Sequence, residues 1–216
     1  GPQLVRGLVG RLHRVRMYSG LSPDLFAQFQ NHQIDMLMTT SDAAGESGVA
    51  QLPLFTEQFV VALPKDYPLG PRASLHDLSR KLPFMNYSVR SLIGRQIDTY
   101  LRSRHPDIEL AFEFDATDPL LSLVREGLGF ALTTPLCLWQ SRHNSSGVRL
   151  VPLSMFHHQG QPYPVPSRQF RLVHRQGELG SLPREVADLV RVAVRELQRD
   201  ITTALELIDG VIEIDN

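Results

Sequence analysis

The sequence DLFAQFQNHQIDMLMTT at residues 24–40 and the sequence DPLLSLVREGLGFALTTP at residues 118–135 share one pattern. In each, apolar residues three or four apart indicate a short amphipathic helix, and a tight turn then leads to an apolar strand that ends in two threonines. Open α/β sheets bind ligands where parallel strands end, because the chain turns away there and leaves a crevice. The repeated pattern therefore predicts two α/β lobes that face one ligand-binding cleft.

The composition is that of an ordinary globular protein, with 216 residues of which 42% are hydrophobic and 21% are charged. Its apolar runs are only a few residues long, whereas roughly 20 residues are needed to cross a bilayer, so we expect no membrane span. The formal net charge of -1 lacks the positive excess of a DNA-binding surface. The single cysteine excludes an internal disulfide and fits a reducing compartment.

Periodicity and turn signals predict the order of the elements along the chain. Ser22 is expected to cap a helix with Pro23 at its first position, and Ser74 and Asp77 are expected to open another. The predicted helices are 3–12, 22–31, a short one from 74, 91–104, 118–126 and a long one from 182 to about 208. The predicted strands are 13–19, 34–39, 58–63, 82–87, 108–114, the segment ending at Thr134, 148–153 and 169–175. Residues 41–48 and 157–167 are predicted to be a loop and a linker.

Catalytic and metal-binding motifs are weak in this sequence. It contains no G-x-S-x-G, H-E-x-x-H or Walker glycine loop and no cysteine pair, and its aspartates lack a second carboxylate at fixed spacing. Cys137 lies among apolar residues and is interpreted as a buried small side chain. The adjacent His157 and His158 are interpreted as solvated, because neighbours in an extended linker point to opposite sides. We therefore expect no enzyme activity, no catalytic residue, no metal and no cofactor.

Four runs in register carry a resemblance to a known family. They are SGLSPDLFAQFQNHQIDMLMTT at 19–40, LPLFTEQFVVALPKDYPLG at 52–70, SLHDLSRKLPFMNYS at 74–88 and SLVREGLGFALTTP at 122–135. In this order they resemble the effector-binding domain of LysR-type transcriptional regulators. The order is the specific feature, since each run by itself recurs in many α/β proteins.

The resemblance implies a two-lobe, periplasmic-binding-protein-like (type II) α/β fold with two crossover strands and a long C-terminal helix. Lobe I is expected at residues 1–63 and 169–216, and lobe II at residues 64–168. The resemblance also implies a cytoplasmic regulator that is a homodimer or homotetramer and senses a small-molecule effector. DNA would be bound only through an N-terminal winged helix-turn-helix domain, which these residues do not contain. The chain departs from the family pattern at its start, where the family has a first strand and a polar loop that supplies part of the effector site.

The candidate effector-binding residues lie where strands end and helices begin, because free backbone N–H groups at a helix N-terminus favour an anion. In lobe I they are Ser19, Gly20, Leu21 and Ser22. In lobe II they are Tyr87, Ser88, Val89, Arg90 and Ser91. Thr40 and Thr134 are added because their hydroxyl groups follow or end the two repeated strands. Arg90 is suited to grip a carboxylate through two parallel hydrogen bonds, so the effector is predicted to be a small carboxylate.

Other interpretations remain open at this stage. Each turn is also consistent with a capped helix beside a solvated arginine, without any ligand. The same fold also occurs in exported solute-binding proteins and in enzymes that carry a cofactor on a cysteine, for which Cys137 is the one candidate. A signal peptide in the upstream gene sequence would identify the first, and labelling by a thiol reagent would probe the second.

Overall fold

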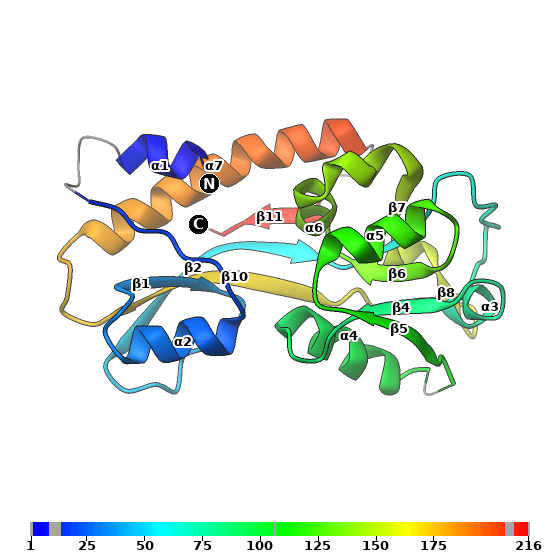
Figure 1. The fold of residues 1–216 in the computed structure, drawn as a ribbon, viewed down its shortest axis with the longest axis horizontal. Helices are drawn as coiled ribbons and strands as arrows, with labels where there is room; N and C mark the ends of the chain where they lie inside the picture. Colours follow the sequence, from blue (N-terminus) through cyan, green and yellow to red (C-terminus); the bar gives the residue numbers. More distant parts are fainter. Residues whose placement is uncertain (1, 9–13, 106, 206–209, 216) are drawn as a thin grey trace. The chain divides into compact units, whose positions relative to one another are not determined.

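The structure is a computed structural model that describes residues 2–8, 14–105, 107–205 and 210–215 (Figure 1). The chain forms two compact units. Unit 1 contains Gly1–Thr56, Gln169–Asp200 and Glu213–Asn216, and unit 2 contains Glu57–Arg168 and Ile201–Ile212. These limits differ from the predicted lobes in residues 57–63 and 201–212, which belong to unit 2.

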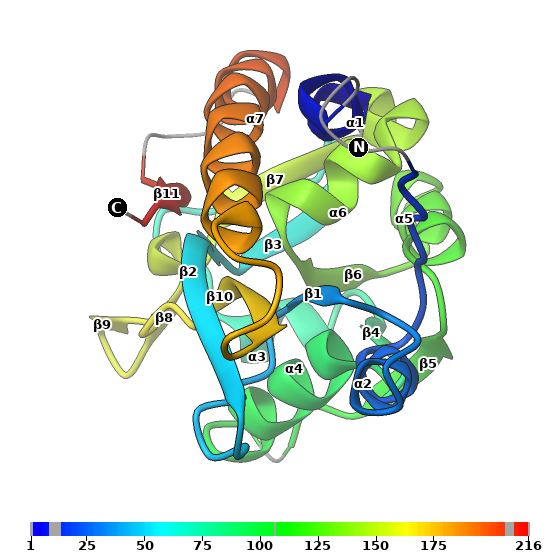
Figure 2. The same cartoon turned by 90° about the vertical axis from the view of Figure 1, so that its left-hand side faces the viewer.

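Unit 1 is organised around a four-stranded sheet with the strand order β1-β10-β2-β11. Its strands and helices are α1 (Pro2–Leu8), α2 (Ser22–Gln30), β1 (Met36–Thr39), β2 (Val49–Gln58), β10 (Ser167–Arg175), α7 (Leu182–Leu205) and β11 (Ile212–Ile214). Helix α2 covers one face of this sheet, while α1 and α7 lie on the other (Figures 1 and 2). Strands β2 and β10 cross from one unit to the other, and β2 was not predicted from the sequence.

The apolar face of α2 explains its position. Phe29 is 1% exposed and packs with Leu37 of β1 and Val173 of β10, which lie opposite each other in the sheet. Strand β1 is an edge strand and pairs antiparallel with β10. The prediction of a parallel strand here was therefore wrong, because the neighbour of β1 comes from a distant part of the chain.

Unit 2 contains a five-stranded sheet with the order β5-β4-β6-β3-β7. Its main elements are β3 (Val60–Pro64), α3 (Leu75–Ser79), β4 (Phe84–Tyr87), α4 (Leu92–Arg102), β5 (Leu110–Phe114), α5 (Thr117–Arg125), β6 (Phe130–Thr133), α6 (Pro135–Gln140) and β7 (Val148–Pro152). Strand β4 pairs parallel with β5 and β6, whereas β3 pairs antiparallel with β6 and β7. Helix α4 lies on one face and α5 and α6 on the other (Figure 1). The carboxyl ends of β4 and β6 therefore meet at one edge of the sheet.

Several local predictions are confirmed. Ser74 caps α3 and Ser91 caps α4, each by accepting a backbone hydrogen bond from the third residue that follows. The long C-terminal helix begins at Leu182, as predicted; its predicted end near 208 lies outside the described residues. The buried apolar side chains of α5 are Leu120, Leu121 and Val124, which have the spacing of one helix face.

Other predictions need correction. The predicted strand at 13–19 is absent from residues 14–19, which are exposed and have no strand partner; residue 13 lies outside the description. Leu21, and not Ser22, is the N-cap of α2. The predicted linker at 157–167 contains a hairpin of β8 (His157–His158) and β9 (Gln161–Pro162). Helix α6 was missed, although Pro135 at its first position is a helix-start signal.

None of the helices in the described part of the chain has the length and apolar character to span a membrane.

Candidate functional site

The loop between β4 and α4 holds the unit 2 turn that was predicted to bind the effector. Ser91 fixes its backbone, because its Oγ accepts a hydrogen bond from the N–H of Gly94 at 3.1 Å and donates to the carbonyl oxygen of Ser88 at 2.7 Å. Ser88 is buried, and its Oγ accepts from the N–H of Arg90 at 3.3 Å. The side chains of Val89 and Arg90 remain exposed. The loop is therefore a rigid turn that leaves one guanidinium group in solvent.

Charge at the start of α4 favours an anion. The first turn contains no acidic residue, so its free N–H groups meet no competing carboxylate. A second guanidinium, Arg95, lies beside the loop and donates to the carbonyl oxygens of Val89 and Arg90 at 3.1 and 3.2 Å. Arg90 itself forms no ion pair with the residues that the structure describes. Arg95 was not singled out from the sequence, although its position four residues after the N-cap placed it on the first turn.

Gly94 explains how closely α4 approaches the loop. A β-carbon at this position would overlap the carbonyl oxygen of Ser88 and lie 2.5 Å from that of Tyr87. Only glycine avoids this overlap. The first turn of α4 is thereby held directly against the end of β4.

The second predicted threonine pair lies at the end of β6 and is completely buried. Thr133 Oγ1 and the hydroxyl of Tyr87 are 2.6 Å apart, which ties the ends of β4 and β6 together. Burial raises the pKa of Tyr87 well above its ordinary value, so its hydroxyl stays protonated. Thr134 Oγ1 accepts a hydrogen bond from Arg168 Nη2 at 3.0 Å. The Thr134 hydroxyl therefore already has a protein partner.

A buried ion pair lies next to Thr134. Arg168 Nη2 is 2.6 Å from Glu57 Oε1, and Arg168 Nε donates to the same oxygen at 2.7 Å. The other carboxylate oxygen, Glu57 Oε2, accepts from the N–H of Leu136 at 3.3 Å, and Arg168 Nη2 lies 3.6 Å from Cys137 Sγ. The Glu57 carboxylate helps to hold the pKa of Arg168 above its usual value despite the opposing effect of burial. This pair was not predicted from the sequence, because its members are 111 residues apart.

In unit 1 the predicted residues lie at the start of α2 and the end of β1. Ser19 and Gly20 are exposed, while Leu21, Ser22 and Thr40 are half-buried. Thr39 Oγ1 donates to Ser22 Oγ at 3.5 Å, so the two segments are neighbours. The exposed carboxylate of Asp24 lies in the first turn of α2, where its negative charge opposes that of an anionic ligand. An anion is therefore less favoured here than at α4.

The described residues contain no group of three or more histidine, cysteine or acidic side chains arranged to hold a metal ion. Cys137 is 8% exposed, in agreement with its interpretation as a buried side chain.

An α/β fold with two crossover strands and polar groups at its strand ends defines a ligand-binding domain. The sequence matches the family described as the LysR substrate binding domain over residues 12–197. The chain therefore belongs to the family of LysR substrate-binding domains and is an effector-binding domain of a LysR-type regulator. Members of this family are regulators and not enzymes. A comparison with curated proteins found no match.

Solved structures with the same fold are regulators of this class. A C206 mutant of Corynebacterium glutamicum OxyR is 19% identical with a TM-score of 0.69, and the match covers 94% of this chain and 62% of that one. The Synechocystis PCC6803 CcmR regulatory domain in complex with 2-PG is 14% identical with a TM-score of 0.69, and 91% of each chain is covered. The effector-binding domain of QuiR in complex with shikimate is 16% identical with a TM-score of 0.62, and 90% of each chain is covered. This likeness shows the fold.

Proposed function

We propose that this domain senses a small anion, a carboxylate foremost, and that the effector controls DNA binding by a winged helix-turn-helix domain on the same polypeptide. The observation that carries the proposal is the position of Arg90 beside the start of α4. Its side chain is exposed and forms no ion pair with the residues that the structure describes. Ser88 and Ser91 fix the loop that presents it. The QuiR and CcmR domains were solved with the small molecules shikimate and 2-PG, which supports a small ligand here.

The residues proposed to bind the effector form one group in each unit. In unit 2 these are Tyr87, Ser88, Val89, Arg90, Ser91 and Thr134. In unit 1 these are Ser19, Gly20, Leu21, Ser22 and Thr40. We assign the anion-binding role to the unit 2 group, because Asp24 opposes negative charge at the start of α2. To the unit 1 group we assign further polar contacts with an effector.

A thermal-shift screen with a panel of small carboxylates tests the site. A ligand present at about one hundred times its dissociation constant stabilises the native state by about 2.7 kcal/mol. Arg90→Ala removes the charge-assisted contact and is expected to remove most of this shift, with Ser88→Ala having a smaller effect. Arg102→Ala is the matched control, since Arg102 is an exposed arginine of α4 that pairs with Asp98. If a carboxylate stabilises all variants equally, these residues do not bind the effector.

We also propose that two copies of the chain associate through the edge strands β1 and β5. These edges carry exposed apolar side chains: Met38 is 48% exposed on β1, and Leu110 and Phe112 are 44% and 50% exposed on β5. Exposed apolar edge strands favour association. Pairing of β1 and α2 of one copy with β5 and α5 of the other gives two identical contacts, which a two-fold symmetric dimer requires.

Control of DNA binding requires a DNA-binding domain outside these residues. The net charge of -1 gives residues 1–216 no general attraction for phosphates. In a gel-shift titration we expect no specific binding of duplex DNA by this segment. Specific binding at sub-micromolar concentration would contradict the assignment of DNA contact to a separate domain.

A further inference from the structure

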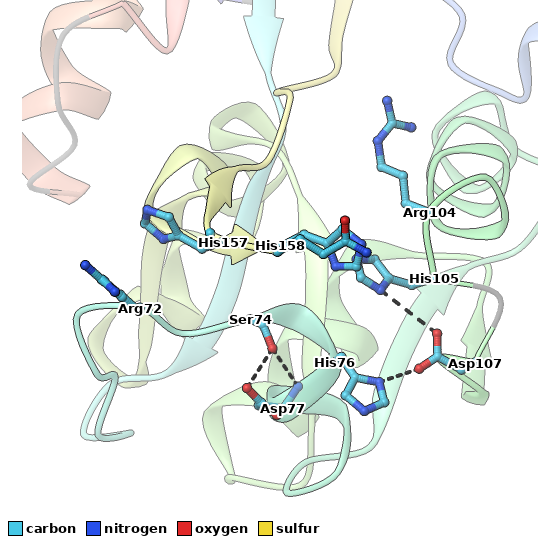
Figure 3. Close-up of a pocket in the computed structure, with 11 residues that line it drawn as sticks. Arg72, Ser74, His76, Asp77, Arg104, His105, Asp107, His157 and His158 are labelled. Atoms are coloured by element: carbon cyan, nitrogen blue, oxygen red, sulfur yellow. Dashed lines mark hydrogen bonds and ion pairs between the residues drawn. The ribbon is translucent and has the colours of Figure 1, made fainter.

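A cavity of about 560 Å³ lies in unit 2, remote in sequence from most of the proposed effector residues (Figure 3). It is bounded by α3 and the segment before it, by the residues that follow α4, and by the β8–β9 hairpin. Ligand pockets commonly have volumes of about 300–1,000 Å³. The lining side chains are all polar or charged, and the remaining residue is Gly160. Such a wall is suited to a hydrophilic molecule and not to an apolar one.

Two arginines line this cavity without a carboxylate partner among the described residues. Arg72 is exposed on the segment before α3, and Arg104 is exposed just after α4. Arg104 Nη1 donates to Ser103 Oγ at 2.8 Å, and its guanidinium lies 4.5 Å from the centre of the Tyr100 ring. Figure 3 shows the two arginines on opposite sides of the histidines of β8. Two positive charges at the rim are therefore available to a ligand.

The carboxylates of the cavity are engaged by its own wall. Asp77 Oδ2 accepts a hydrogen bond from Ser74 Oγ at 2.8 Å. Asp107 forms an ion pair with His76, and its other oxygen lies 4.0 Å from His105 Nδ1 (Figure 3). The pKa of Asp107 is lowered, first by a backbone hydrogen bond and also by its contact with His76. Negative charge is thus partly compensated within the wall, whereas the two guanidinium groups remain uncompensated.

Four of the eight histidines of the chain line the cavity: His76, His105, His157 and His158. The His158 ring contacts the His105 ring edge-on, with 4.6 Å between centres. His157 Nδ1 is buried and has no hydrogen-bond partner in the described structure. The sequence-based interpretation of the two as a solvated pair was wrong for His157, whose Nδ1 is buried, whereas His158 is exposed as that interpretation expected.

The tip of the hairpin holds these groups in a defined place. Gln159 and Gly160 have φ values of 50° and 82°, as in the two-residue turns that match strand twist. The hairpin also packs through Tyr163, whose hydroxyl is 2.6 Å from His105 Nε2. The buried His105 and Tyr163 therefore anchor this side of the cavity in unit 2, while His158 and the turn residues are exposed.

We propose that this cavity is a second ligand site, separate from the effector residues, and that it binds a small hydrophilic oxyanion bearing sulfate-like, phosphate or carboxylate groups. Arg72 and Arg104 provide the charge, and the histidine rings provide further hydrogen-bonding nitrogens. The negative charges of Asp77 and Asp107 repel an anion unless Ser74 and His76 remain in contact with them. The site therefore selects compact, strongly charged anions. A ligand bound there acts on unit 2 without contacting the loop between β4 and α4.

Calorimetric titration with sulfate tests the site, because sulfate is a compact oxyanion of fixed charge. We expect sulfate to bind to the unchanged protein. Malonate in place of sulfate shows whether carboxylates are accepted, and neutral sorbitol should not bind. Arg72→Gln and Arg104→Gln should each weaken binding about tenfold through loss of a charge-assisted contact. Arg102→Gln, two residues before Arg104 and outside the lining, should bind like the unchanged protein.

Further variants separate this site from the effector site and test the histidine wall. Sulfate binding should persist in Arg90→Ala, so failure of one site leaves the other testable. His157→Asn with His158→Asn should weaken sulfate binding, because both residues line the cavity, while His32→Asn in unit 1 should not; His32 has φ 57°, which asparagine tolerates. Absence of sulfate binding, or equal affinity in both arginine variants and the unchanged protein, overturns the proposal.

Discussion

Arg168 and Glu57 form an ion pair that is almost closed to solvent, with 2.6 Å between Nη2 and Oε1 and no exposed surface on Glu57. The pair joins β10 to β2 at the two points where the chain crosses between units. It also fixes the end of β6, because Arg168 donates to Thr134 and Glu57 accepts from the N–H of Leu136. Both crossover strands and the second threonine pair are therefore connected by one buried network.

Removing one member of this pair is expected to be costly. Glu57→Leu leaves a buried guanidinium without its counter-charge, and we expect a loss of about 3–5 kcal/mol in the free energy of unfolding. Arg168→Met should cost a similar amount. The double variant Glu57→Leu with Arg168→Met should recover much of the loss, since no uncompensated charge remains. Urea unfolding of the four proteins measures this cycle, and simple additivity would show that the two residues do not depend on each other.

The close approach of α4 to its loop predicts a second effect. Gly94→Ala places a methyl group against the carbonyl oxygens of Ser88 and Tyr87, so we expect a destabilisation of about 1–3 kcal/mol. Gly70→Ala is the control, because a β-carbon there meets no atom within 4 Å. Thermal unfolding compares the two. An unchanged stability in Gly94→Ala would mean that the loop moves away without cost.

Local signals explain which parts of the fold the sequence predicts. Ser74 and Ser91 identify helix starts because capping involves residues only three apart, and the spacing of Leu120 and Val124 identifies a buried helix face. The antiparallel pairing of β1 with β10 depends on residues far apart in sequence, such as Leu37 and Val173. No local pattern encodes such a pairing.

The same distinction applies to the sites. The loop from Ser88 to Ser91 is predictable, because a strand end followed by a capping serine is a local feature. The pairing of Arg168 with Glu57 cannot be predicted from the sequence, because it depends on two crossover strands that meet only in the fold. The histidine cavity was not predicted for the same reason, since His76, His105 and His158 come from three separate segments.

The pH dependence of stability should report on His105. Burial, followed by the proximity of His158, lowers the pKa of His105 below its ordinary value of 6.5. Burial raises the pKa of Tyr163 to about 12, so its hydroxyl stays protonated and shares a hydrogen bond with His105 Nε2. Protonation is therefore harder in the folded than in the unfolded state, and stability is complete above pH 6.5 and falls as the pH drops below it.

Thermal unfolding between about pH 7 and about pH 5 measures this effect. At about pH 7 the His105→Asn variant should unfold at a lower temperature than the unchanged protein, but its unfolding temperature should change less with pH. His143→Asn is the control, because His143 is exposed and lies outside the cavity. Equal slopes in all three proteins would exclude His105 as the source. Asp42 and Asp107 do not affect this comparison. Their pKa values are lowered in the folded protein, so the stability that they contribute is lost only as the pH falls below 3.8.

The apolar edge of β5 predicts how the chain assembles. Phe112 is half exposed on an edge strand, and we expect it to be buried in a dimer at micromolar concentration. Phe112→Glu places a charge in that contact and should weaken the dimer at least about tenfold, since central aromatic residues carry much of an interface's energy. Val192→Glu is the matched control, because Val192 is equally exposed, on α7. Sedimentation equilibrium distinguishes the outcomes. Equal weakening by both substitutions would place the contact elsewhere, and a strictly monomeric unchanged protein would favour the solute-binding interpretation over the regulatory one.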